Sequence, residues 1–155
     1  MTTWNNPIWS AESVTDAKLN TRIRDNMTLL KNPAQDSYTF AYSASPYASA
    51  GASDWTLIDA NLELTLDTQG GDVLLLFRAK ANACVMTFFV DGSNVGGNDG
   101  IFAFPNLGGA GAGITGQMIW PVRDLIAGSH TFGVYWKGGV LRSPVPPNFS
   151  AREFS

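Results

Sequence analysis

Few side chains in this chain are of the types that carry out catalysis or bind metals. The 155 residues include one histidine, His130, and one cysteine, Cys84. A single cysteine cannot form an internal disulfide or a cysteine-rich metal site, and it begins an apolar segment, which is typical of a small buried residue. A lone histidine after a Gly-Ser turn is typical of a hydrogen-bonded sheet residue. We therefore predict no cofactor and no metal, and an enzyme, for which only scattered carboxylates remain as candidates, is the weakest of the functions considered.

A glycine-rich segment, residues 111–116, matches the G-x-G-x-x-G pattern of dinucleotide-binding loops. That motif works only where a helix follows it, because the helix N-terminus must meet the pyrophosphate. The next residues, Gln117-Met118-Ile119-Trp120-Pro121, are instead typical of a strand. The sequence therefore argues against a nucleotide site.

Two short segments, Asp91-Gly92-Ser93-Asn94 and Asn98-Asp99-Gly100, bring several oxygen donors together. Calcium takes about six to eight oxygen ligands, and such a loop could supply some of them. The spacing differs from that of an EF-hand, and no glutamate closes the loop. The same residue types are favoured where tight turns need positive φ. We predict turns here, with calcium binding as the alternative.

The aromatic side chains of the second half are the remaining candidates for a binding function. They could fill the core and subunit contacts, or they could form a platform for a sugar. Core or interface is the interpretation we favour. The residues concerned are Tyr47, Trp55, Phe102, Phe104, Trp120, Tyr135 and Trp136.

The elements that position these side chains divide into two parts, residues 1–35 and 36–155. In the first, Ser13-Val14-Thr15-Asp16 fits a helix-capping pattern and Asn32-Pro33 ends the helix. Apolar residues on one face follow at helical spacing, preceded by an arm with two tryptophans. We expect this arm and amphipathic helix either to pack on their own domain or to anchor the chain to a neighbour. The predicted anchoring residues are Trp4, Ile8, Trp9, Leu19, Ile23, Met27 and Leu30.

From Asp36 onward, the apolar pattern changes to the alternation of strands. Leu62, Leu64 and Leu66 alternate with polar residues, and Phe132, Val134 and Trp136 do the same later in the chain. Residues 72–80 begin apolar on both faces, which indicates a central strand, and Asp91-Gly92 predicts a hairpin turn. Further strands are expected at residues 38–42, 84–90, 114–122 and 149–154. Because Gly, Pro and Asn turns separate these short strands, we predict a mainly β fold, an antiparallel jelly-roll sandwich.

Composition excludes several classes of partner. The formal net charge is −3, so the chain has no diffuse attraction for nucleic-acid phosphates. The apolar run at residues 73–77 is far shorter than the roughly 20 residues of a membrane span, and no secretory signal is visible at residues 1–7. Charged residues make up 15% of the chain, against about 25% in a typical domain. Such a neutral surface favours contact with other subunits.

A family resemblance is carried by residues 14–20, 24–26 and 29–33, which read VTDAKLN, RDN and LLKNP. This pattern, with Trp9 in the place of a leading tryptophan, resembles a segment near the N-terminus of many tailed-bacteriophage virion proteins. The remainder, especially Val90-Asp91-Gly92 and residues 127–132, is similar to jelly-roll heads related to the C1q and tumour-necrosis-factor fold. The chain lacks the repetitive shaft of a long fibre.

The resemblance implies a non-enzymatic structural protein of a phage particle. It implies a homo-oligomer, most simply a trimer, located in the virion and held by its N-terminal arm to another virion protein, such as the major capsid or tail protein. We expect a compact capsid decoration or accessory protein. The alternative is a receptor-binding or carbohydrate-binding module at a tail tip or fibre, which predicts an exposed aromatic cluster beside Asp or Asn.

Overall fold

The computed structural model describes residues 20, 21, 23, 36–41, 47–48, 54–108, 113–141 and 146–154. The chain divides into two units, Met1–Ala34 with Ser155, and Gln35–Phe154. In the first unit only Asn20, Thr21 and Ile23 are described, and their backbone is helical. Three residues do not define a helix, so the amphipathic helix stays a prediction. The rest of it, with the arm before it, lies outside the described residues.

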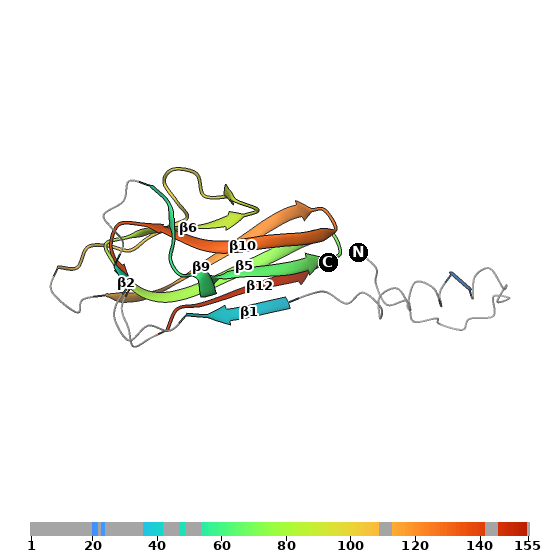
Figure 1. Cartoon of the computed structure of the whole chain (residues 1–155), viewed down its shortest axis with the longest axis horizontal. Coiled ribbons are helices and arrows are strands. Elements are labelled where there is room, and N and C mark those ends of the chain that lie inside the picture. The colour runs from blue at the N-terminus through green and yellow to red at the C-terminus, as the bar shows by residue number, and fades with distance from the viewer. Residues whose placement is uncertain are drawn as a thin grey trace, which may run out of the picture. The chain divides into compact units, whose positions relative to one another are not determined.

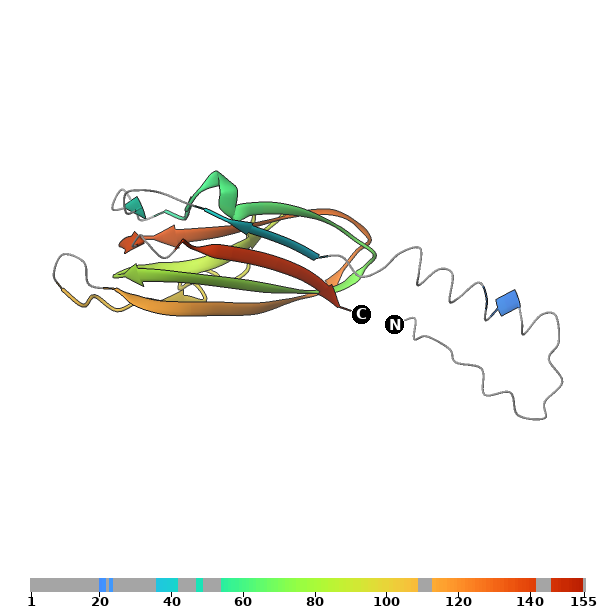
Figure 2. The ribbon, with the colours of Figure 1, turned by 90° about the horizontal axis from the view of Figure 1, so that it is seen from below.

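The second unit consists of two antiparallel sheets that lie face to face (Figures 1 and 2). In the first sheet, β5 is the central strand, with β12 and β11 along one edge and β9 along the other. The outer neighbours β1 and β2 pair with β12 and β11. The strands are β1 (Asp36–Phe40), β2 (Tyr47–Ala48), β5 (Gly71–Asn82), β9 (Ile114–Leu125), β11 (Val140–Leu141) and β12 (Asn148–Phe154).

The second sheet is built around β10, which pairs with β6 on one edge and with β3 and β4 on the other. Two short strands, β7 and β8, pair with β6. A 3-10 turn, η1 (Ala60–Leu62), leads into β4. The strands are β3 (Thr56–Leu57), β4 (Glu63–Thr68), β6 (Val85–Val90), β7 (Ser93–Asn94), β8 (Phe102–Ala103) and β10 (Gly128–Lys137).

One continuous apolar core lies between the two sheets. Its members follow the alternation of the sequence, because every second side chain of a strand points to the same face. The predicted inward faces of β4 and β10 are confirmed, and the largest side chains of the core come from both sheets. The largest fully buried side chains include Phe77, Phe88, Phe132, Phe149, Leu62 and Leu75.

The predicted hairpin turn at Asp91-Gly92 is also confirmed. Both residues have positive φ, 48° at Asp91 and 77° at Gly92, as a tight turn between β6 and β7 requires. The turn sets Val90 opposite Ser93. Strand β9 extends three residues beyond the predicted end at Val122.

A substitution at Gly139 tests the turn between β10 and β11, because this residue combines a positive φ with close packing. Its φ is +74°, and a Cβ added there would lie 2.5 Å from the Asn82 carbonyl oxygen. Gly139→Ala is therefore expected to lower the free energy of unfolding by about 2–4 kcal/mol, measured by urea titration. Gly92→Ala is the matched control, since φ is +77° and no atom lies within 4 Å of the added Cβ. It should cost only about 1 kcal/mol. Equal losses in the two variants would contradict the packing argument.

Candidate functional site

The predicted anchoring residues lie almost entirely outside the described part of the chain. This holds for Trp4, Ile8, Trp9, Leu19, Met27 and Leu30. Ile23 is described, and it is 48% exposed. Anchoring through this stripe therefore stays a prediction. Within the described residues, no helix is long and apolar enough to cross a membrane.

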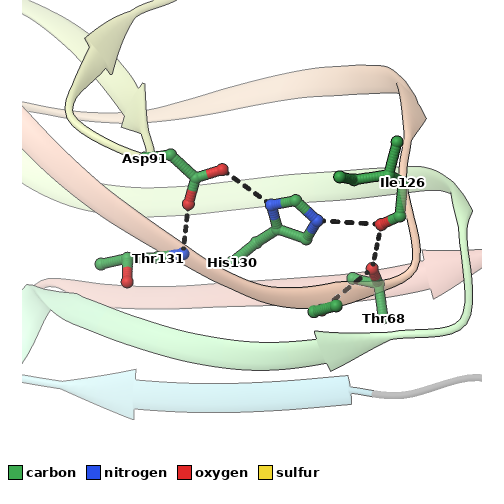
Figure 3. A network of polar contacts seen from close by, with 6 residues as sticks. Thr68, Asp91, Ile126, His130 and Thr131 are labelled. Atoms are coloured by element: carbon green, nitrogen blue, oxygen red, sulfur yellow. Dashed lines mark hydrogen bonds and ion pairs between the residues drawn. The ribbon is translucent and has the colours of Figure 1, made fainter.

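His130 lies at the centre of a polar network at one end of the sandwich (Figure 3). Its Nδ1 is 2.7 Å from Asp91 Oδ2, and its Nε2 is 2.9 Å from the carbonyl oxygen of Ile126. The other carboxylate oxygen of Asp91 accepts a hydrogen bond from the Thr131 amide, and the Thr68 hydroxyl donates to the Ile126 carbonyl. The network ties the turn before β10 to β4 and to the turn after β6.

The two partners of the imidazole ring are both acceptors. A neutral imidazole has one N–H only, so we assign the doubly protonated, cationic form, which donates from both nitrogens. The hydrogen bond to Asp91 and the bond to the Ile126 carbonyl raise the pKa of His130, although burial opposes them. Burial raises the pKa of Asp91, but the hydrogen bonds from His130 and Thr131 outweigh burial and hold this pKa below its usual value. The prediction of a hydrogen-bonded sheet histidine is confirmed.

Two of the residues considered for calcium, Asp91 and Asn94, use their side-chain oxygen atoms in hydrogen bonds within the fold. Asp91 binds His130 and Thr131, as described above. Asn94 Oδ1 accepts hydrogen bonds from the Thr87 hydroxyl and the Gly96 amide, while Asn94 Nδ2 donates to the Gly97 carbonyl. No group of three or more His, Cys, Asp or Glu in the described ranges is arranged to hold a metal ion. Asn94 thus holds the turn that follows it, and Asp91 joins the loop to β10.

The other candidate residues of the sequence are accounted for by packing. Cys84 is buried, and burial raises its pKa to about 12, as expected for an inert hydrophobic residue. The residues after the glycine-rich segment form β9, a strand rather than a helix, as expected. Phe104 and Trp136 are in the core, while Tyr47, Phe102 and Trp120 pack partly buried against it. Tyr135 of β10 and Trp55, which precedes β3, are both partly buried.

The solvent side of the first sheet carries an apolar surface that the sequence analysis did not identify. Leu76 lies opposite Ile119 of β9 and Ser150 of β12, and Ser150 lies opposite Tyr38 of β1. Tyr38 is 65% exposed and Ile119 is 54% exposed. Two apolar pairs in register, Leu74 with Pro121 and Leu76 with Ile119, form the centre of a surface that we call the apolar sheet face; Ser150 and Arg152 of β12 lie within it. Its residues are Tyr38, Leu74, Leu76, Ile119, Pro121 and Phe154.

The sequence held a signal for this face. Residues 72–80 begin apolar on both sides of the strand, and we interpreted this as a central strand. The interpretation is correct for the hydrogen bonds, because β5 has neighbours on both edges. One of its two apolar sides, however, lies outside the sandwich, where Leu74 and Leu76 are only partly buried.

The solvent side of the second sheet is different in character. Phe89 and Tyr135 are both partly buried, and their rings stack with centroids 3.9 Å apart and planes inclined by 23°. Burial, and then the nearby charge of Glu63, raise the pKa of Tyr135. Lys137 Nζ lies 4.4 Å from the ring centroid of Trp55.

Comparisons with known proteins add no assignment. No protein-family model matches the chain, and a search of curated proteins finds no significant match. The function must therefore be argued from the two sheet faces and from the residue patterns of the first unit.

The His130 network predicts a pH-dependent stability. Because the pKa of His130 is raised by folding, its contribution is complete below the unfolded-state pKa, about 6.5, and is lost as the pH rises through the higher folded-state pKa. We expect the difference in free energy of unfolding between the wild type and His130→Gln to shrink as the pH rises from about 6 to about 9. Urea titrations at several pH values measure it. A difference that stays constant over this range would contradict the cationic assignment.

Proposed function

We propose that this protein is a non-enzymatic structural subunit of a bacteriophage particle, with a homo-oligomeric head and an N-terminal anchor. The observation that carries the proposal is the apolar sheet face. Large apolar patches are uncommon on monomeric proteins and mark sites of association. The centre of this face lies on β5 and β9, where Leu74 and Leu76 face Pro121 and Ile119, and Ser150 of β12 lies between Leu76 and Tyr38.

The strand order supports the jelly-roll interpretation. The first sheet has the order β1-β12-β5-β9, and the second has β4-β10-β6-β7. Along the chain these eight strands alternate between the two sheets, and only β6 and β7, joined by the Asp91-Gly92 turn, follow one another within the same sheet. Eight strands in two facing sheets with this order match the arrangement of a jelly roll, and each six-stranded sheet adds two short strands to it, β2 and β11 in the first and β3 and β8 in the second. The sequence resemblance implies a head of this kind, and the strand order supports that proposal.

The physical basis of assembly is burial of the apolar sheet face between copies of the head. Complete burial of one large apolar side chain is worth about 1.5–3 kcal/mol. Several such residues, each already held in place by its strand, lose little entropy on binding. We propose a trimer, which places three N-terminal segments on one particle and increases their retention through multivalency.

The proposed anchor is the apolar stripe of the first unit, with its two tryptophans. The chain enters the head at Asp36, which lies opposite Arg152 near the end of β12. The anchor would bury Trp4, Trp9 and the helical stripe against a neighbouring virion protein, such as the major capsid or tail protein. The acidic net charge of −3 supports protein partners rather than nucleic acid.

Ile119→Lys tests the oligomer interface. The wild type is expected to have a mass in solution about three times the chain mass of 16.6 kDa, measured by light scattering after gel filtration. Ile119→Lys should shift it towards the monomer, because the substitution places a charge in the buried contact. Ile126→Lys is the matched control, since Ile126 is 76% exposed on the turn before β10 and outside this face. A monomeric wild type, or equal effects of the two substitutions, would contradict the proposal.

Deletion of residues 1–35 tests the anchor. The remaining chain, 36–155, contains every described strand and should keep the circular dichroism and thermal unfolding of a folded head. It should no longer sediment with purified phage capsids or tails, whereas the full chain should do so. Association of the deleted chain at undiminished affinity would show that the anchor lies elsewhere.

A further inference from the structure

The second sheet carries a group of side chains that the proposed assembly leaves unused. It lies on the opposite side of the sandwich from the apolar sheet face, on the solvent side of β4, β10 and β6. The register sets Gly133 of β10 directly between Glu63 of β4 and Phe89 of β6. Gly133 is therefore the centre of a row that runs from a carboxylate to an aromatic ring.

The side chains around Gly133 converge above its bare Cα. A Cβ added there would lie 3.0 Å from Cε2 of Tyr135, 3.4 Å from Cδ1 of Leu57 and 3.5 Å from Oε2 of Glu63. The Tyr135 ring thus leans over the glycine, towards Phe89, and the two rings stack. The absence of a side chain at Gly133 lets the ring pair and the carboxylate come together in one place.

The polar groups of this cluster have capacity for a ligand. Glu63 is exposed. Its Oε2 atom and the Tyr135 ring both lie within 3.5 Å of the position that a Cβ of Gly133 would take. The cluster therefore places two partly buried aromatic rings beside an exposed carboxylate, which is a hydrogen-bond acceptor, on one surface.

We propose that this cluster, Glu63, Phe89, Gly133 and Tyr135, binds a saccharide. The face of an aromatic ring carries partial negative charge and attracts the positively polarised C–H bonds on the apolar side of a sugar ring. The Glu63 carboxylate accepts hydrogen bonds from sugar hydroxyl groups, and such charge-assisted bonds are the stronger kind.

The surroundings of the cluster favour a saccharide over a second protein copy. The other outward side chains of β4 and β10 are polar: Thr65, Asp67, Ser129 and Thr131. A stable subunit contact needs a broader apolar core, which the opposite sheet face supplies. A ring pair set in a polar surface suits a ligand that is itself polar but has one apolar side. The proposal does not depend on the assembly proposed above.

The test is binding of the full chain to a printed array of bacterial and animal glycans, followed by calorimetric titration of the best-bound glycan. Glu63→Gln should weaken binding at least tenfold, because it removes the charge and keeps the shape. Tyr135→Leu should do the same, because it keeps an apolar side chain and removes the ring. Thr65→Val, two residues from Glu63 on the same face, is the matched control and should change affinity less than twofold.

Each result decides between the alternatives. A blank array, or a glycan that binds Glu63→Gln and Tyr135→Leu as well as the wild type, overturns the proposal. So does a loss of oligomer mass in both variants without glycan binding, which assigns this face to a subunit contact. Glu63 is exposed, so Glu63→Gln keeps the test decisive if Tyr135→Leu fails to fold, as judged by circular dichroism.

Discussion

The stacking of Phe88 on Phe149 joins the two sheets of the head. Phe88 belongs to β6 and Phe149 to β12, and their fully buried rings lie with centroids 5.6 Å apart and planes inclined by 22°. Once these two side chains point inward, the strict alternation of a strand fixes the direction of all the remaining side chains on β6 and β12. Because β12 pairs with β5 and β6 pairs with β10, the inward and outward sides of these neighbouring strands are fixed as well. The outward faces, and thus the surfaces available for function, follow from the core.

Those outward faces divide the proposed functions between the two sides of the molecule. The first sheet presents aliphatic and aromatic residues in register, such as Leu76 beside Ile119, which suits contact with identical subunits. The second presents mostly polar residues around one aromatic pair, Phe89 with Tyr135, which suits a polar ligand. Because the core separates the two surfaces, assembly through one would leave the other open. A ligand bound in several copies of the head would then gain from multivalency.

The sequence predicted the long strands well and the surfaces poorly. Alternation is a local property, so the inward faces of β4 and β10 and the Asp91-Gly92 turn could be located from the residues alone. The contact between Asp91 and His130 joins residues 39 positions apart, and it depends on the pairing of β6 with β10. The convergence of Glu63 and Phe89 on Gly133 depends on two strand pairings, that of β10 with β4 and that of β10 with β6. The short strands β2, β3 and β11 have too few residues for any period to be visible.

The pairing of β1 with β12 has a mechanical consequence. Five residue pairs join these strands, from Asp36 with Arg152 to Phe40 with Asn148, and β1 is the first strand after the N-terminal unit. A pull on the N-terminal segment along the direction of β1 loads all of these pairs in shear, so their hydrogen bonds must break together rather than one after another. With the N-terminal anchor proposed above, the head would resist detachment by drag or collision better than its modest contact length suggests. Under such a load, another part of the tether would fail before β1 separates from β12.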